Sequence, residues 1–293
     1  MTFERTREGQ RNRALFYGVD FICYVEGDDG ADQGDDVYFW SSVFRSVWPN
    51  RSAAFLCRGG KPQLEKLARE VVNENVEGVV VAMDADYAGF FEGKVIDDPR
   101  VLYTFGYSWE NDVFGPETTL ESHRSLCTRA DIPDPVCDEH RRHWDLAAQF
   151  LLRMTKADFG AFRAGGSIID AQKPGKHVGR DTDGYPVFRR DLFLATLTAE
   201  NARLRPRSMK ECIGVPNDGI RYVKGRVLAL VSRYIATSCA KLMSNIKSVS
   251  EAHYRHVCLD ELCAHIKNDA PMLEAARHHK MQIDRLGQSL IFS

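Results

Sequence analysis

The stretch that decides the fold is GVVVAMDAD, residues 78–86. Its first six residues are apolar and rich in valine, which is typical of a strand buried on both faces of a parallel sheet. The two aspartates come where such a sheet carries its working groups, just beyond the carboxyl end of a strand. This stretch therefore predicts both a fold class and the place of a site.

Further apolar runs flank this stretch, and the segments between them have helical spacing. The apolar runs are VDFICYV (19–25), AAFLC (53–57) and VLYTF (101–105), and the segments between are DVYFWSSVFRSVW (36–48) and PQLEKLAREVVNEN (62–75). Leu64, Leu67 and Val71 fall on one side of the second helix. This alternation predicts an α/β fold, a parallel sheet flanked by helices.

Beyond about residue 125 the pattern changes to longer helical segments. We predict helices over residues 138–156, 189–204, 222–246, 250–267 and 270–286, with a hairpin at DTDGYP (181–186). The chain then divides into an α/β domain, residues 1–125, and a mainly α-helical domain, residues 126–293. The second domain would serve dimerisation or the binding of a partner or nucleic acid.

The composition is that of a soluble cytoplasmic protein. The chain has 293 residues, 44% of them hydrophobic, and its eight cysteines form no Cys-x-x-Cys pair. The start, MTFERTREGQRNR, is too polar for a secretory signal, so we expect reduced thiols in a cytoplasm. No apolar run approaches the roughly 20 residues that span a bilayer.

The two halves differ in charge. Residues 1–125 carry 13 Lys and Arg against 22 Asp and Glu, a net charge of −9, whereas residues 126–293 carry 26 against 19, a net charge of +7. The acidic half could gather divalent cations and the basic half could bind phosphates, although two ordinary solvated surfaces would give the same charge counts. If the second half docks nucleic acid, its basic residues should share one surface. They are Arg189, Arg190, Arg203, Arg205, Arg207, Lys210, Arg221, Lys224 and Arg226.

Polar residues follow each predicted strand. They are Glu26-Gly27, Arg58-Gly59-Gly60-Lys61, Asp84-Ala85-Asp86 and YSWEN (107–111). Asp84 and Asp86 lie two residues apart and can face one cation, and Glu26 would complete an all-oxygen site for Mg²⁺ or Mn²⁺. An Asp-x-Asp pair alone is more often turn chemistry or capping. The presence of Glu26 after the neighbouring strand favours a metal site, because carboxylates at adjacent strand ends repel one another unless a cation offsets their charge.

An acidic stretch, DDGADQGDD (28–36), follows Glu26. Its members Asp28, Asp29, Asp32 and Asp35 are expected to solvate a loop. Asp36 lies at the expected start of a helix, where it could cap free N–H groups or reach the metal.

These motifs together resemble a known family. VEG (25–27), DDVYFW (35–40), RGGK (58–61), DAD (84–86) and YSWEN are similar to the Toprim domain of nucleases related to the OLD family, above all the AriB effectors of the PARIS anti-phage defence system. The resemblance covers about the first 115 residues. Topoisomerases, primases and recombination proteins share the Glu and Asp-x-Asp pair, so it specifies the fold better than the reaction.

The resemblance implies an Mg²⁺-dependent endonuclease that acts as a toxic effector. Its substrate would be RNA, in particular tRNA, or DNA, which OLD relatives cut. It further implies an ABC-type ATPase partner that holds the effector inactive and a homodimer once the effector is freed. The alternative is a non-enzymatic Toprim scaffold or phosphate-sensing subunit of an ATPase complex, which would bind a partner without cleaving nucleic acid.

The resemblance also assigns roles to residues. Glu26 would be a metal ligand or general acid/base, and Asp84 and Asp86 would be metal ligands. The supporting or second-metal residues would be Asp36, Glu110 and Ser108; the late basic residue Lys224 or Arg226; and the phosphate contacts Arg58, Lys61 and Arg226. The insertion DDGADQGD (28–35) departs from the family spacing and leaves its aspartates as rivals of Asp36.

Other motifs carry less. RGGKP is not a Walker A loop, because a proline follows the lysine and no glycine stands at position 55. A phosphatase of the haloacid dehalogenase type would carry its Asp-x-Asp after the first strand. Two groups of Cys and His residues invite a zinc interpretation, yet their spacings fit no known finger and packed side chains are more common. They are Cys137, His140 and His143, and separately His253, His256, Cys258, Cys263 and His265.

Overall fold

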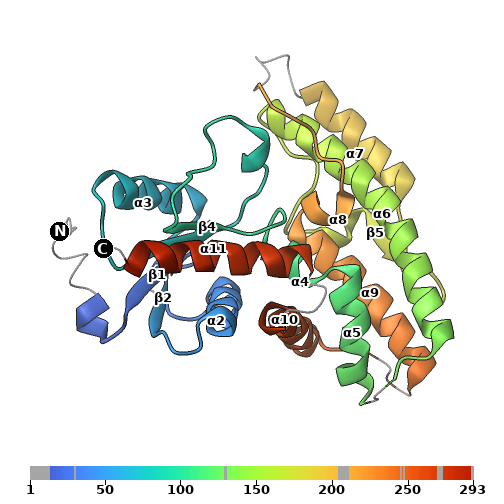
Figure 1. The fold of residues 1–293 in the computed structure, drawn as a ribbon. Coiled ribbons are helices and arrows are strands. Elements are labelled where there is room, and N and C mark those ends of the chain that lie inside the picture. The colour runs from blue at the N-terminus through green and yellow to red at the C-terminus, as the bar shows by residue number, and fades with distance from the viewer. Residues whose placement is uncertain are drawn as a thin grey trace. The chain divides into compact units, whose positions relative to one another are not determined.

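A computed structural model describes residues 14–29, 31–128, 131–203, 211–244, 246, 248–268 and 273–291 (Figure 1). The chain forms two compact units. Unit 1 takes its residues from 1–85, 95–105 and 263–293, and unit 2 takes its residues from 86–94 and 106–262. These units interleave along the chain, whereas the predicted domains 1–125 and 126–293 meet at a single cut. That cut stays a prediction.

Unit 1 contains a parallel sheet of four strands in the order β2-β1-β3-β4. The strands are β1 (Phe21–Val25), β2 (Ala53–Cys57), β3 (Val79–Met83) and β4 (Val101–Tyr103). In register, Phe21 pairs with Ala53, Tyr24 with Val81, and Met83 with Tyr103. The predicted fold class is thereby confirmed: an N-terminal parallel sheet flanked by helices, followed by a mainly helical region.

Both faces of the sheet are covered by helices, as the apolar strands predict. The helix α3 (Lys61–Asn73) covers one face, where Leu64, Leu67 and Val71 pack with Ile22 and Val81. The helix α2 (Asp35–Val47) lies on the other face. Phe21 points to that face, since alternate residues of a strand point to opposite sides of the sheet. There the ring of Phe21 lies 5.3 Å from that of Phe44.

The C-terminal helix α11 (Glu274–Ile291) also belongs to unit 1 and packs on α2. His279 of α11 is fully buried, and its ring lies 5.4 Å from each of Phe39 and Trp40, edge-on to both. Residues from the end of the chain thus complete the core around the N-terminal sheet.

The helix α11 also closes the edge of the sheet at β4. The Tyr103 N–H donates to Gln282 Oε1 at 3.0 Å, and Gln282 Nε2 donates back to the Tyr103 carbonyl at 2.8 Å. The same carbonyl accepts from Nε2 of His278 at 3.0 Å, so that nitrogen carries the proton. One side-chain amide therefore does what a neighbouring strand would do.

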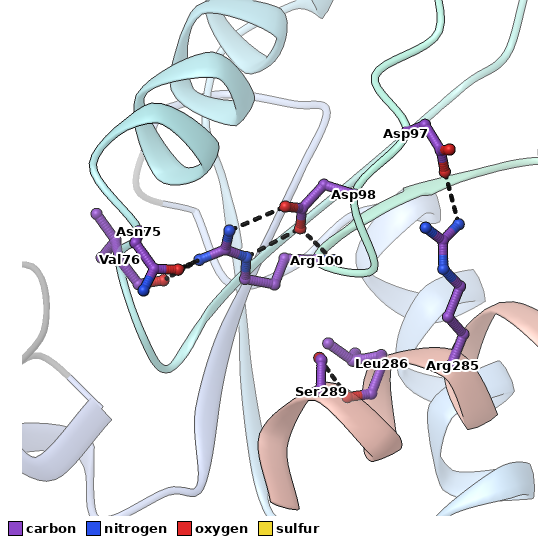
Figure 2. A network of polar contacts seen from close by, with 8 residues as sticks. All are labelled: Asn75, Val76, Asp97, Asp98, Arg100, Arg285, Leu286 and Ser289. Atoms are coloured by element: carbon purple, nitrogen blue, oxygen red, sulfur yellow. Dashed lines mark hydrogen bonds and ion pairs between the residues drawn. The ribbon is translucent and has the colours of Figure 1, made fainter. Parts of the chain in front are cut away.

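Ion pairs hold the segment that leads into β4 (Figure 2). Arg100 donates to both carboxylate oxygens of Asp98, at 2.9 Å each, and to Oδ1 of Asn75 at 2.9 Å. These hydrogen bonds lower the pKa of Asp98 and raise that of Arg100. On α11, Arg285 reaches Asp97 at 2.7 Å, and both of these side chains are exposed.

Unit 2 is mainly helical. Its elements are η1 (Ala88–Phe90), α4 (Trp109–Val113), α5 (Pro116–Cys127), α6 (Asp134–Arg163), η2 (Pro174–Lys176), β5 (Val178–Arg180), β6 (Pro186–Phe188), α7 (Arg190–Arg203), α8 (Gly219–Tyr222), α9 (Gly225–Met243) and most of α10 (Glu251–Lys267). The predicted hairpin is confirmed, since β5 and β6 pair antiparallel around residues 181–185. The long helices are confirmed with shifted ends, and α5 is an addition that the sequence did not predict. None of the helices within the described ranges is long and apolar enough to cross a membrane.

Candidate functional site

Glu26 is the first residue after β1, at the carboxyl edge of the sheet. The next residue, Gly27, has φ 138°, and a Cβ there would lie 2.5 Å from Sγ of Cys57. The Gly27 N–H donates to the Gly59 carbonyl at 3.0 Å. Only glycine can pass this close to the end of β2, so the Glu-Gly pair fixes where the Glu26 side chain leaves the sheet.

Asp84 is the first residue after β3, the strand that pairs with β1. Because Tyr24 pairs with Val81, Glu26 and Asp84 follow neighbouring strands at the same edge. The turn after Asp84 is held from β4, since the Ala85 N–H donates to Oγ1 of Thr104 at 2.9 Å. Two acidic residues of the predicted site therefore share one sheet edge in unit 1.

The predicted phosphate-binding turn, Arg58 to Lys61, lies at this edge too. Lys61 begins α3, and its ammonium donates to the backbone carbonyl of Asp84 at 2.7 Å. The guanidinium of Arg58 lies 3.2 Å from the Asp29 carboxylate, with both side chains largely exposed. Such an exposed pair contributes little stability, so Arg58 can exchange Asp29 for another anion.

The acidic stretch folds over the end of β2. The Cys57 N–H donates to the Ala31 carbonyl at 2.8 Å. Burial raises the pKa of the Cys57 thiol, and the negative charges of Asp36, Asp28 and Asp32 raise it further. Asp28 and Asp32 are exposed, as the sequence predicts for a solvated loop, and they still lie close enough to the end of β2 for their charges to act on this thiol.

The helix α2 begins one residue before the expected start. Its first residue is Asp35, and its N-cap is Gly34, with φ 146° and no side-chain capping bond. Asp36 is thus the second residue of the helix and not its cap, which corrects the expectation from the sequence. A carboxylate in the first turn still stabilises the helix N-terminus.

Asp86 belongs to unit 2, although Asp84 belongs to unit 1. Asp86 has φ 48°, an unusual left-handed conformation for a residue with a side chain. Its N–H donates to the Tyr107 carbonyl at 2.7 Å, and the Tyr107 N–H donates to the Arg221 carbonyl at 2.8 Å. The segment around α8 therefore holds the YSWEN element, which in turn holds Asp86.

The YSWEN element starts the short helix α4 with a capping box between Ser108 and Asn111. Ser108 Oγ donates to Oε2 of Glu110 at 2.6 Å, and Nδ2 of Asn111 donates to the Val223 carbonyl at 2.9 Å. A Cβ on Gly225, the first residue of α9, would collide with both Ser108 Oγ and Glu110 Oε2. The structure thus brings Ser108 and Glu110 together at the start of α9.

Lys224 is held inside unit 2. Its ammonium donates to Ser167 Oγ at 2.6 Å and to the Ile169 carbonyl at 2.7 Å, and it lies 3.8 Å from Oδ2 of Asp158. The Asp158 side chain is only 1% exposed and also accepts from the Ile168 N–H at 2.7 Å. These contacts give Lys224 a structural task, and its catalytic role stays a prediction.

Asp158 is the residue that sequence reasoning missed. It also accepts a hydrogen bond from the hydroxyl of Tyr87 at 3.3 Å, and Tyr87 directly follows Asp86. One signal for it exists in the sequence: Asp158 shares a helix face with Leu151 and Met154, at spacings of seven and four residues. An acid at such a position needs a buried partner, but the sequence does not say which.

The predicted basic surface is described only in part. Arg205, Arg207 and Lys210 lie outside the described residues, as does the side chain of Arg203. The Arg189 guanidinium covers Gly179, where a Cβ would lie 2.8 Å from its Nε. Arg226 donates to Gln172 Oε1 at 3.1 Å. The shared surface stays a prediction.

In the Cys and His groups that invited a zinc interpretation, His140, His143, Cys258 and Cys263 are buried, whereas His253 and His256 are exposed. His140 Nε2 accepts from Trp144 Nε1 at 3.1 Å, and the His143 ring stacks on Tyr185 at 3.4 Å. Cys258 is fully buried, which raises its pKa to about 12. Within the described ranges, no three His, Cys, Asp or Glu side chains are grouped so that they could hold a metal ion. The metal prediction therefore rests on the hard oxygen donors of Glu26 and Asp84, which suit Mg²⁺ and Mn²⁺.

No protein-family model matches the chain, and a search of the curated proteins finds no match. The fold itself is an α/β unit with a parallel sheet in the order 2-1-3-4, which is compatible with a Rossmann-like or a Toprim-like fold. No family is identified beyond this, so the finer assignment depends on the motifs.

Proposed function

We propose that the chain is a metal-dependent Toprim nuclease. One observation carries this proposal: Glu26 and Asp84 directly follow β1 and β3, which are neighbouring parallel strands. Sheets of this kind carry their ligand-binding groups at the carboxyl edge. Carboxylates brought close together there would repel unless a cation offsets their charge. A metal-dependent phosphodiester hydrolase can use such an arrangement.

In this proposal Glu26 and Asp84 hold Mg²⁺ or Mn²⁺, with Asp86 and Asp36 as further candidate ligands. When bound, the cation would polarise the phosphodiester and acidify a water molecule. Glu26 takes the proton of the attacking water on a carboxylate oxygen. Lys61 supports the Asp84 turn through its 2.7 Å hydrogen bond to the Asp84 carbonyl.

The remaining roles follow the same proposal. Arg58 and Arg226 bind backbone phosphates, which adds affinity without sequence preference. Glu110, which accepts a hydrogen bond from Ser108, is proposed as a supporting residue. Lys224 would neutralise charge in the transition state only if it leaves its contact with Asp158.

The cellular role is proposed from the resemblance of the VEG, DAD and YSWEN motifs. The chain would act in the cytoplasm as a toxic effector of anti-phage defence, cutting RNA, with tRNA as the first candidate, or DNA. An ABC-type ATPase partner would hold it inactive, and a homodimer would be the active form.

The test is cleavage of total RNA, purified tRNA and plasmid DNA by the purified chain, with Mg²⁺ or Mn²⁺ and with EDTA. Asp84→Asn and Glu26→Gln keep the size of each side chain and remove its charge, so each should abolish metal-dependent cleavage and any toxicity on expression. Asp97→Asn is the matched control, because Asp97 is an exposed acid of the same unit. Its cleavage should equal that of the wild type.

Asp36→Asn tests whether the aspartate that follows the inserted loop is a metal ligand. If Asp36 only stabilises the first turn of α2, asparagine costs a few tenths of a kcal/mol and leaves cleavage intact. If Asp36 is a metal ligand, cleavage falls as it does in Asp84→Asn. A fully active Asp84→Asn protein would end the nuclease proposal, and partner binding without cleavage would favour the scaffold alternative.

A further inference from the structure

The outer edge of β2 has backbone groups that the proposed nuclease does not use. Within the described ranges β2 pairs only with β1. The Arg58 N–H points inward, to the Val25 carbonyl at 2.9 Å, and the Cys57 N–H points outward, to the Ala31 carbonyl at 2.8 Å. Because backbone groups of a strand alternate in direction, those of Phe55 and Ala53 face outward like that of Cys57.

A hollow of about 180 Å³ lies beside this edge, and Ala53 is part of its lining. Four aromatic rings line it: those of Phe21, Phe44, Trp48 and Phe55. The Phe44 ring lies 5.5 Å from Phe55 and 6.1 Å from Trp48, edge-on to both. The volume is below the roughly 300–1,000 Å³ of small-molecule sites, so it suits one side chain.

The hollow is preformed by its surroundings. Gly287 of α11 lies against the indole of Trp48, so closely that a Cβ at Gly287 would lie 2.7 Å from that ring. The neighbouring ring of Phe21 is almost fully buried. An incoming side chain would therefore find its walls in place and pay little ordering entropy.

The charged residues that line the hollow are basic. Arg45 and Arg51 belong to the lining, and none of the described lining residues is acidic. Arg45 is exposed at the end of α2. Arg51 lies 3.8 Å from Asp20, with half-exposed side chains that a stronger partner could separate. An occupant with carboxylates is favoured over one with basic residues.

We propose that the β2 edge binds an extended acidic segment of a partner protein by strand addition. The backbone of the segment would pair with Ala53 and Phe55, and an aromatic or aliphatic side chain would fill the hollow. A carboxylate on the segment would meet Arg45 and Arg51. A second copy of this chain fits less well, because pairing two β2 edges brings together two sets of arginines.

Labelled pentapeptides with acetylated and amidated ends test this proposal by fluorescence anisotropy with the full chain. The probes are EVFVE, EVWVE and EVLVE, and their counterparts carry lysine in place of glutamate. At least one acidic peptide should bind, and at least about tenfold more tightly than its lysine counterpart. A copy N-methylated at alternate residues keeps its side chains but not its strand pairing, and it should bind at least about tenfold more weakly.

Two variants locate the binding. Ala53→Pro removes an outward N–H at the first residue of an edge strand, where proline is tolerated, and should weaken binding. Arg45→Glu should favour the lysine peptides instead. Arg69→Glu reverses an exposed charge on α3, on the opposite face of the sheet, and should bind like the wild type. Should Ala53→Pro unfold early, the N-methylated peptide makes the same test from the ligand side.

Several outcomes would overturn the proposal. One is the absence of binding by all three acidic peptides at concentrations up to about 1 mM, where even a weak complex would form. Another is equal binding of the acidic and lysine peptides, or of the N-methylated copy. Self-association of the wild type in sedimentation velocity that Ala53→Pro abolishes would assign the edge to a second copy and overturn the acidic partner.

Discussion

The two edges of the sheet end in opposite ways. At β4, the Gln282 side chain bonds both backbone groups of Tyr103, so a helix of the same chain replaces a further strand. At β2, the backbone groups of Ala53 and Phe55 face outward beside an aromatic hollow. An exposed edge invites unwanted pairing, and proteins usually protect it. Within the described ranges, the chain closes the β4 edge with its own residues, whereas at β2 it bonds Cys57 but leaves Ala53 and Phe55 without a neighbouring strand.

The largest expected effect comes from breaking the network behind the closed edge. The side chains of Arg100 and Asp98 are 13% and 14% exposed. Arg100→Ala leaves a largely buried carboxylate without its partner, so we expect a loss of about 3 kcal/mol in the free energy of unfolding, at the low end for such pairs. Urea unfolding measures it. A loss below about 1 kcal/mol, as for an exposed pair, would mean that β4 is held by other contacts.

Gln282→Leu should turn β4 into an open edge. Leucine has a similar size but cannot bond the Tyr103 N–H and carbonyl, which should cost about 1–3 kcal/mol. Hydrogen exchange at the Tyr103 amide should accelerate by the corresponding factor, and the opened edge should promote self-association. Met281→Leu changes an exposed neighbour and is the control. Unchanged exchange at Tyr103 would show that Gln282 does not close the edge.

A smaller effect should appear as a pH dependence at the closed edge. The hydrogen bonds from Arg100 lower the pKa of Asp98 in the folded chain. The pair therefore stabilises the fold above the unfolded pKa of about 4, and this contribution is lost as the pH falls through the folded pKa. The wild type should be more stable than Asp98→Asn at neutral pH, with a gap that narrows in acid. A gap that stays constant down to acid unfolding would exclude the charge as its cause.

The smallest expected effect belongs to Arg285→Ala. Arg285 and Asp97 lie 2.7 Å apart, but their side chains are 55% and 83% exposed. Water and salt screen such a pair, so the loss should be about 0–1 kcal/mol and should fall further in high salt. Thermal unfolding at low and high salt measures it. If Arg285→Ala lowered the free energy of unfolding as much as Arg100→Ala, the exposed Arg285–Asp97 pair would be a main contact that holds α11 to the segment before β4.

The sheet could be predicted from the sequence because its strands are short apolar runs that end in polar turns. GVVVAM and FICYV needed no knowledge of their partners to be recognised as buried strands. The same rule predicted that Glu26 and Asp84 lie at one edge, since each directly follows such a run. The local pattern was sufficient to predict the strands and the residues that follow them, because each buried run ends at a polar turn.

Other features depend on contacts that no local pattern contains. The helix α5 was missed because Thr118, Thr119, Ser122 and His123 occupy its buried face, where a sequence pattern expects apolar residues. Burial keeps His123 neutral by lowering its pKa to about 4, so even this polar residue packs in a core. When polar residues occupy the buried face, the sequence lacks the regular spacing of apolar residues by which helices are recognised.

Partners that are distant in the sequence were equally out of reach. The resemblance offers Lys224 as the late basic residue of the site, yet its ammonium lies beside Asp158 of α6. Gln282 falls in the predicted helix 270–286, but no local pattern shows that it bonds the backbone of Tyr103 twice, 179 residues earlier in the chain. Side chains of this kind acquire a task only when the fold brings them to a backbone group or a charge.

The closure of β4 by α11 also sets the order in which the protein can mature during synthesis. At roughly 5–20 residues per second, a ribosome needs roughly 10–35 s to travel the 179 residues from Tyr103 to Gln282. For that time the nascent sheet has two open edges, and the residues of unit 2 are made meanwhile. A slow or stalled ribosome in this interval would prolong the exposure of a strand prone to wrong pairing. Chaperone dependence should therefore peak before α11 emerges.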